Sequence, residues 1–206
     1  MDAGKPPKMR SDARRNRRLL LEAAGEVLRT EPHRAAMPLI AERAGLSVAT
    51  AYRYYSSLED LLNAYLHGVI VALRDYSHDC PRTGKALFED VVHEWFRLLR
   101  LYGSAMVQLR AREGFLHRLR DNDVVISTVR DAWERPVRSV MRDIGVPDEE
   151  FDYALFLYNI LFDPREILDL LDSGFSEEGA IRKMVATYYA ALRGWTLNSP
   201  QPCRAR

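Results

Sequence analysis

Apolar residues recur at intervals of three and four positions along most of the 206-residue chain, which is the spacing of one face of an α-helix. The first run predicts a helix that begins near Ser11 or Asp12 and ends before Pro32, because the residue preceding a proline resists the helical conformation. A second long run predicts a helix from about Leu58 to the region 76–80. No segment shows the alternation of a strand, so we predict an all-α fold with about nine helices.

The same spacing predicts helices through the rest of the chain. Pro136 stands inside one of them and should bend it, because proline removes a helical hydrogen bond. The segment 148–162 is apolar nearly all round, which is typical of a helix buried on several sides or against a partner. Asp163 has the position of a helix cap. The helices predicted after the second run cover residues 85–101, about 104 onward, 115–120, 123–144, 148–162, 167–171 and 176–195.

Residues 40–55 have the pattern of two short helices joined by a tight turn. Ile40, Ala41 and Ala44 share one helical face. Gly45 follows where a left-handed residue ends a helix, and Ser47 can cap the next one with its hydroxyl. Two helices held by such a turn form a helix-turn-helix, whose second helix can enter the major groove of DNA.

Charge is distributed unevenly along the chain. Residues 1–56 contain eleven Lys/Arg and six Asp/Glu, a net charge of +5, whereas the remainder contains 19 and 23, a net charge of −4. A basic head on a mildly acidic body is typical of a polyanion-binding module on a separate scaffold. Basic residues are unfavourable at a helix N-terminus, so the cluster of Arg14, Arg15, Arg17 and Arg18 indicates phosphate contacts; a solvated charged face is the alternative.

Residues 14–66 resemble the DNA-binding domain of TetR-family transcriptional regulators. Three positions depart from the family pattern: Glu31 replaces a usual Gly, Ala36 a usual Ser/Thr cap, and Leu58 a Lys that usually reaches a phosphate. The motifs that carry the resemblance are Arg17-x-x-Leu20-Leu21-x-Ala23-Ala24, Ile40-Ala41-x-x-Ala44-Gly45-Leu46-Ser47-x-x-Thr50-x-Tyr52-x-Tyr54-Tyr55 and Leu58-Glu59-Asp60-Leu61-Leu62.

The resemblance implies an N-terminal three-helix helix-turn-helix domain and a C-terminal helical domain for ligand binding and dimerisation. We expect a mobile arm over 1–10, the DNA-binding domain over 11–57, the effector-binding and dimerisation domain over 58–196, and a tail over 197–206. In the family, the first residues of the recognition helix meet bases and its aromatic hydroxyls meet phosphates. The DNA-binding residues implied are Arg14, Arg15, Arg17, Arg18, Ser47, Val48, Ala49, Thr50, Tyr52, Arg53 and Tyr54.

A single short recognition helix offers few base contacts, so affinity and specificity require two copies on a palindromic operator. TetR-like proteins commonly pair their last helices, and the resemblance therefore implies a homodimer. The predicted interface residues are Phe151, Leu155, Tyr158, Phe162, Met184 and Tyr188.

The family also binds small effectors, so the resemblance implies a pocket among the helices of residues 85–144 for an organic ligand of unknown identity. We expect a repressor that this ligand releases from double-stranded DNA, with no cofactor. A TetR-like DNA-binding scaffold or co-regulator without an inducer is the alternative. The predicted ligand-binding residues, each of which also fits simple core packing, are Trp95, Tyr102, Met106, Gln108, Arg112, Phe115 and Trp133.

Other classes of protein find little support in the sequence. Cys80 and Cys203 lie far apart and form no disulfide framework or metal finger. His78-Asp79 is the dipeptide of metal-dependent phosphohydrolases of the HD type, but no two histidines have the spacing of a metal pair, so no metal site and no enzyme is expected. No apolar run approaches the length of a membrane span and the charged N-terminus lacks a signal-peptide core, so we expect a cytoplasmic protein.

Overall fold

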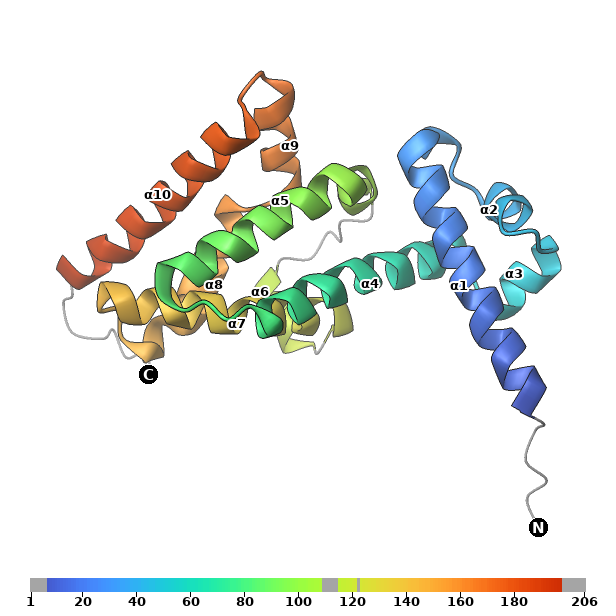
Figure 1. Ribbon diagram of the computed structural model, residues 1–206, viewed down its shortest axis with the longest axis horizontal. Coiled ribbons are helices and arrows are strands. Elements are labelled where there is room, and N and C mark those ends of the chain that lie inside the picture. Colours follow the sequence, from blue (N-terminus) through green and yellow to red (C-terminus); the bar gives the residue numbers. More distant parts are fainter. Residues whose placement is uncertain (1–6, 109–114, 122, 198–206) are drawn as a thin grey trace, which may run out of the picture. The chain divides into compact units, whose positions relative to one another are not determined.

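The computed structural model describes residues 7–108, 115–121 and 123–197 (Figure 1). These residues form ten α-helices and two short 3-10 helices and contain no strand, which confirms the all-α prediction. The elements in chain order are α1 (Pro7–Thr30), η1 (Pro32–Arg34), α2 (Met37–Arg43), α3 (Val48–Tyr54), α4 (Leu58–Asp79), α5 (Gly84–Gln108), α6 (Phe115–Arg120), α7 (Val124–Ile144), η2 (Asp148–Glu150), α8 (Phe151–Leu161), α9 (Pro164–Asp172) and α10 (Glu177–Leu197).

Most predicted boundaries agree with these elements, and two are corrected. Helix α1 begins at Pro7, so residues 7–10 of the predicted arm are helical; proline is well tolerated at a first helical position because its missing N–H has no helical partner there. The two helices predicted over 85–101 and from 104 are one helix, α5. Gly103 is buried inside this helix and does not end it.

Local capping explains several of the boundaries. The side chain of Asp123 accepts a hydrogen bond from the N–H of Ile126 at 3.0 Å and starts α7, and Gly145 ends that helix with φ 84°. Asp163 accepts from the N–H of Arg165 at 2.9 Å and starts α9, with Pro164 as the first helical residue. These caps satisfy backbone groups that a helix leaves without an internal partner.

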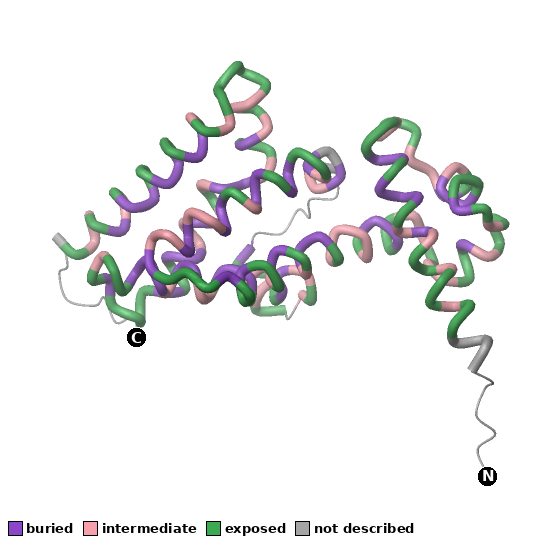
Figure 2. Tube along the Cα trace, in the orientation of Figure 1, coloured by how far each residue is buried: buried purple, intermediate pink, exposed green. Residues whose placement is uncertain are grey.

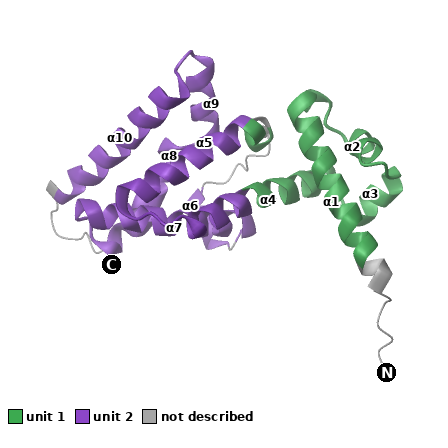
Figure 3. Cartoon of the chain, viewed as in Figure 1, with its two compact units in different colours: residues 1–69, 101–110 green, residues 70–100, 111–206 purple. Residues whose placement is uncertain are grey.

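The chain divides into two compact units (Figure 3). Unit 1 comprises residues 1–69 and 101–110, and unit 2 comprises residues 70–100 and 111–206. Helices α4 and α5 each contribute residues to both units. In each unit, one face of the long helices is buried and the opposite face is exposed, as amphipathic spacing requires (Figure 2).

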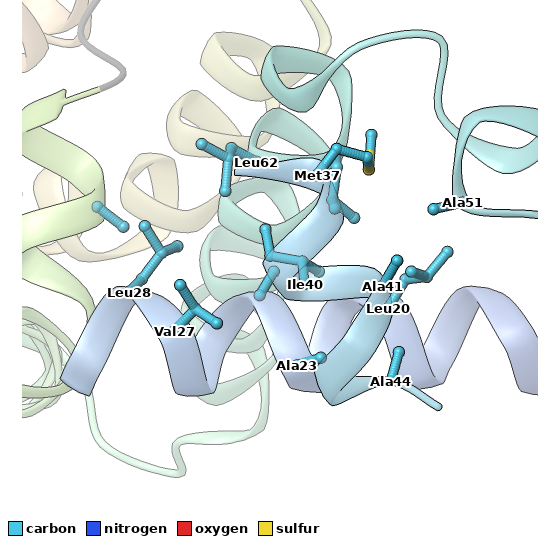
Figure 4. Packing of buried hydrophobic residues seen from close by; sticks show 13 residues of the cluster. Leu20, Ala23, Val27, Leu28, Met37, Ile40, Ala41, Ala44, Ala51 and Leu62 are labelled. Atoms are coloured by element: carbon cyan, nitrogen blue, oxygen red, sulfur yellow. The ribbon is translucent and has the colours of Figure 1, made fainter. Parts of the chain in front are cut away.

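The core of unit 1 is formed by residues from five helices (Figure 4). Helices α2 and α3 have only seven residues each and could not be stable alone, so this shared core holds them in place. Leu20, Ile40, Ala41, Ala51 and Leu61 are fully buried. The other buried members of the core are Ala23, Ala24, Val27, Leu28, Met37, Ala44, Leu62 and Ala105.

A glycine allows one close contact in unit 1. Tyr65 of α4 packs edge-on against Tyr102 of α5, with 5.7 Å between the ring centres. On α1, a Cβ atom added to Gly25 would stand 2.6 Å from the Tyr65 hydroxyl and 2.8 Å from a ring carbon. Burial raises the pKa of Tyr65 to about 12, and the neighbouring Tyr102 adds to this. The Tyr65 ring therefore fills a tight space between three helices.

Unit 2 has an aromatic core. Trp133 of α7 lies against Tyr158 of α8, with 3.9 Å between ring centres, and Phe88 of α5 stacks on Tyr188 of α10 at 5.0 Å. The Tyr188 hydroxyl donates a hydrogen bond to the carbonyl of Ala154 at 3.0 Å. Large rings therefore fill this interior, and this buried hydroxyl has a hydrogen-bond partner.

Arg135 of α7 holds the C-terminal end of α4. Its guanidinium donates hydrogen bonds to the carbonyls of Ser77, His78 (3.3 Å), Cys80 (2.8 Å) and Arg82 (3.0 Å). The last carbonyls of a helix lack internal partners and carry partial negative charge, so one arginine here both satisfies and neutralises them.

We predict that Gly25→Ala destabilises the protein by about 1–3 kcal/mol, because the added methyl overlaps the end of the Tyr65 ring and would force it out of its packing against Tyr102. The matched control is Gly68→Ala in α4, where an added Cβ meets nothing within 4 Å. There the better helix propensity of alanine should stabilise by roughly 0.5–1 kcal/mol. Urea unfolding followed by far-UV circular dichroism measures both; equal shifts in the two variants would contradict the tight contact.

Candidate DNA-binding site

The turn between α2 and α3 follows the glycine-ended pattern predicted for it. Gly45 adopts φ 66°, a left-handed conformation that favours glycine. The N–H of Gly45 bonds to the carbonyl of Glu42 at 3.0 Å and that of Leu46 to the carbonyl of Ala41 at 2.9 Å. This pair of bonds is the Schellman motif, which closes a helix and fixes the direction of the chain that leaves it.

Ser47 caps α3 as the sequence predicts. Its hydroxyl oxygen accepts a hydrogen bond from the N–H of Thr50 at 3.1 Å. The hydroxyl groups of Ser47 and Thr50 are also bonded to each other, at 2.8 Å. Both ends of the turn are therefore satisfied by local hydrogen bonds, and the orientation of α3 on unit 1 is fixed.

Helix α3 is buried on one face and exposed on the other. Ala51 is fully buried in the core of unit 1, which anchors the helix. Val48 and Tyr52 are 38% and 50% exposed, and Ala49 and Arg53 are exposed too. Residues four apart share a helical face, so these four side chains form a continuous strip that is free to meet DNA.

The Tyr54 side chain, predicted to contact DNA, is already held by contacts within the chain. Its hydroxyl accepts a hydrogen bond from the side-chain amide of Asn16 in α1 at 3.3 Å, and the Arg53 guanidinium lies 5.2 Å from its ring centre. The bond from Asn16, together with Arg53, lowers the pKa of Tyr54. Asn16 was absent from the predicted site; the one signal for it is that it is the uncharged residue within a run of arginines.

The predicted basic cluster is on the surface of α1. Arg14, Arg15, Arg17 and Arg18 are all exposed. Arg18 forms an ion pair with Glu22 at 3.5 Å, but both side chains are mostly exposed, so this pair contributes little to stability. The cluster thus lies on the surface, and its one ion pair within the described residues is exposed.

Comparison with known proteins agrees with this geometry. Residues 20–65, which contain α2, α3 and the turn between them, match the sequence model of the bacterial regulatory proteins of the tetR family. Residues 20–65 therefore form a DNA-binding domain of the TetR type. No curated protein matches the chain by sequence.

Solved structures show the same fold over nearly the whole chain. The TetR-like regulator LfrR from Mycobacterium smegmatis, determined in complex with proflavine, is 19% identical with a TM-score of 0.54 and covers 85% of this chain and 94% of its own. A candidate transcriptional regulator from Pseudomonas aeruginosa PAO1 is 16% identical, with a TM-score of 0.57 and coverage of 92% and 93%. AmtR from Mycobacterium smegmatis is 17% identical, with a TM-score of 0.50 and coverage of 98% and 99%.

Two of the departures from the TetR-family pattern have a structural role. Glu31, where the family usually has Gly, has φ −142° and needs no left-handed backbone. Its carboxylate accepts a hydrogen bond from Arg43 of α2 at 2.8 Å. Arg43 also donates to Glu26 of α1 at 2.6 Å, so this arginine links α2 both to α1 and to the start of η1. Leu58, where the family usually has Lys, is half-buried against the core of unit 1, and Ser57 accepts from the N–H of Asp60 at 3.0 Å and caps α4.

The third departure, Ala36, leaves its helix without a side-chain cap. Ala36 has the extended backbone of an N-cap residue but makes no side-chain hydrogen bond to the first turn of α2. Pro38 in that turn has no N–H to satisfy, which lowers the cost of the missing cap.

The predicted dimer residues need correction. Phe151, Leu155, Tyr158, Phe162, Met184 and Tyr188 are each at most 8% exposed in the single chain. Their side chains pack in the core of unit 2, so they leave no surface for a second copy. The sequence could not separate the two apolar faces of the segment 148–162, because nearly all of its positions are apolar.

The predicted ligand-binding residues do not come together in one described site. Trp95, Phe115 and Trp133 are buried in unit 2, where the Trp95 indole N–H donates to the carbonyl of Phe162 at 3.2 Å. Tyr102 and Met106 are half-buried and belong to unit 1. Arg112 and the side chain of Gln108 lie outside the described residues.

Three histidines that lie on different helices have separate surroundings. The ring nitrogen of His78 lies 3.3 Å from Asp131, that of His117 lies 3.1 Å from Asp121, and His93 bonds to the carbonyl of Glu89 at 2.7 Å. Within the described ranges, no three His, Cys, Asp or Glu side chains are grouped as metal ligands. No described helix has the length and apolar character needed to cross a membrane.

We predict that replacing one arginine of the α1 cluster by glutamine, as in Arg14→Gln or Arg17→Gln, weakens DNA binding by a similar factor on every sequence. The slope of log K against log salt should fall by about one for each phosphate contact removed. Fluorescence anisotropy of a labelled duplex at several salt concentrations measures it. Arg142→Gln in α7 removes an exposed arginine of unit 2 and is the control; an equal loss there would show that only net charge matters.

Proposed function

We propose that the chain binds a palindromic operator as a homodimer, represses transcription there, and is released by a small organic effector. The observation that carries the proposal is the exposed strip of α3, Val48, Ala49, Tyr52 and Arg53, on a helix fixed by the Gly45 turn and the Ser47 cap. Fixed side chains on a helix of this kind can read base edges in a major groove. The protein would act in the cytoplasm, where its DNA is.

Two copies are required because the reading surface is small. Helix α3 has seven residues, of which four form the exposed strip. A single such helix gives too few contacts for the affinities typical of specific DNA binding. Two helices related by a two-fold axis double the contacts and match half-sites about 34–36 Å apart, which makes the operator palindromic.

A surface of unit 2 suits pairing with a second copy. Tyr153 and Ile160 of α8 are 54% and 50% exposed, and they share a face with the half-exposed Phe156 and Leu157. The ring of Tyr153 lies 4.9 Å from that of Trp195, which links this face to α10. On α10, Ala186, Ala190 and Gly194 are spaced four apart, so small residues there would allow a partner helix to come close. We therefore place the dimer contact on this face, called the α8–α10 face.

Release by an effector would act through the helices that belong to both units. Helix α4 carries Leu61 and Leu62 in the core of unit 1, and its C-terminal end is held by Arg135 in unit 2. A ligand that favours a different position of α4 would change the separation of the two recognition helices in the dimer. Ligand and DNA then compete through the conformation that each prefers. LfrR, solved with proflavine, has a similar fold, which makes proflavine the first ligand to try.

Selection of bound duplexes from a random DNA pool tests the proposal. We expect an enriched palindrome whose half-site centres lie about one helical turn apart, bound with a steep dependence on salt. The Tyr52→Ala variant should lose affinity for it by at least tenfold, whereas the matched control Tyr76→Ala, at a tyrosine of unit 2 that is 40% exposed, should not. An enriched but non-palindromic site, or none, would favour a scaffold role instead.

The effector step is tested on the same operator. Ligands, proflavine first, are titrated into the complex while anisotropy reports the DNA still bound. A ligand that saturates the free protein must lower operator affinity, since the coupling between two sites is reciprocal. Equal operator binding by ligand-free and ligand-saturated dimers would refute this part of the proposal.

We predict that Ile160→Lys on the α8–α10 face converts the dimer to a monomer. The added charge would be buried against an apolar partner surface, which costs far more than an exposed charge does. Size-exclusion chromatography with light scattering gives the mass, 23.7 kDa for a single chain. Val124→Lys, at a valine 66% exposed on α7, is the control. A dimer that persists in Ile160→Lys would place the contact elsewhere.

A further inference from the structure

The half of the exposed strip of α3 that lies nearest its N-terminus is apolar. Val48 and Ala49 are the first two helical residues, and both are exposed. Next to Val48 is the cap Ser47, and the following buried position is Ala51. In a helix-turn-helix, the N-terminal residues of the recognition helix are the ones that reach base edges. The first groups to meet the bases are thus hydrocarbon.

The hydroxyl groups of Ser47 and Thr50 form a hydrogen bond with each other. The Ser47 oxygen already accepts from the Thr50 N–H, and the hydroxyls share a bond of 2.8 Å. Only one hydroxyl hydrogen of the pair is left to donate elsewhere. Neither side chain can form the two-point contacts by which arginine reads guanine or asparagine reads adenine.

The stronger hydrogen-bonding groups of α3 come one turn later. Tyr52 and Arg53 lie four residues beyond Val48 and Ala49, which is about 6 Å along the helix axis. The Arg53 guanidinium also lies over the Tyr54 ring, whose hydroxyl is bonded to Asn16 of α1. Arg53 is thus placed beside the basic cluster of α1, where phosphate is the expected partner.

We propose that Val48 and Ala49 read the methyl groups of thymine, and that these contacts carry much of the sequence specificity. In the major groove, the thymine methyl is the one apolar group that a base pair presents. The positive charge of the N-terminal segment attracts any DNA, so discrimination must come from the strip itself. This inference rests on the proposed function, because it names the base chemistry that the same site selects.

Uracil in place of thymine tests the inference, since it removes only the methyl group. In the operator obtained by selection, each thymine is replaced singly by deoxyuridine and the affinity is measured. We expect an affinity loss of about fourfold per buried methyl at one or two positions of each half-site, and about sixteenfold when both half-sites are changed. At the same positions, the protein should bind a duplex with 5-methylcytosine more tightly than one with cytosine, by a similar factor.

A protein variant assigns the methyl contact to a residue. In Val48→Ala, the loss caused by deoxyuridine should shrink towards onefold at the position that Val48 meets, while the loss at the position of Ala49 remains. Val48→Thr keeps the shape of valine with one methyl replaced by a hydroxyl, and it should weaken binding to thymine more than to uracil. Val48 is an exposed residue, so both variants are expected to fold, and circular dichroism checks this.

The outcomes separate this inference from the function on which it rests. A palindrome that is bound tightly and is indifferent to uracil at every position overturns the methyl readout and leaves the dimeric regulator intact. A uracil effect that is unchanged both in Val48→Ala and in Ala49→Gly assigns the methyl to another residue, which also overturns the inference. A pool that yields no enriched sequence overturns the proposed function and this inference together.

Discussion

The structure of the DNA-binding unit depends on a core that its two shortest helices cannot provide for themselves. A helix of seven residues is marginal in water, because the cost of nucleation is spread over very few hydrogen bonds. The methyl group of Ala51 anchors α3 in this core, and the side chains of Ile40 and Ala41 anchor α2. Ala41 and Ala51 are small, so the helices lie close together. The angle between α2 and α3 therefore follows from their packing.

That core also includes helices that continue into unit 2. Leu61 and Leu62 come from α4, and Ala105 comes from the last turns of α5. The tight contact of Gly25, Tyr65 and Tyr102 joins these two helices to α1. A close-packed interior responds to a shift of one member as a whole, because there is little free volume to absorb it. Helices α4 and α5 thus each belong to the core of unit 1 and continue into unit 2.

Local features could be predicted from the sequence because their causes are local. The Gly45 turn, the Ser47 cap and the Asp163 cap each involve residues within five positions of one another, so a single sequence contains the whole interaction. The departure at Leu58 was visible too, but its burial against the core of unit 1 depends on neighbours that only the fold supplies.

Long-range features could not be predicted for the same reason. The four carbonyls that Arg135 binds are more than fifty residues away, and Asn16 meets Tyr54 across 38 positions. The faces of α8 were ambiguous, since a helix with apolar residues all round has no periodicity from which to choose its buried side. For this reason the predicted interface residues proved to be core residues, and the exposed ones, Tyr153 and Ile160, were left out.

The two kinds of contact at the DNA surface have different physical roles. Arginines on α1 would neutralise phosphates, and this contribution would strengthen binding to all sequences alike and weaken as salt rises. Methyl contacts from Val48 and Ala49 would distinguish sequences through a hydrophobic term that salt screening does not reduce. Affinity and specificity would then vary separately: higher ionic strength lowers the occupancy of every site but keeps the ratio between the operator and other DNA. A regulator built in this way can exchange quickly among sites and still prefer one.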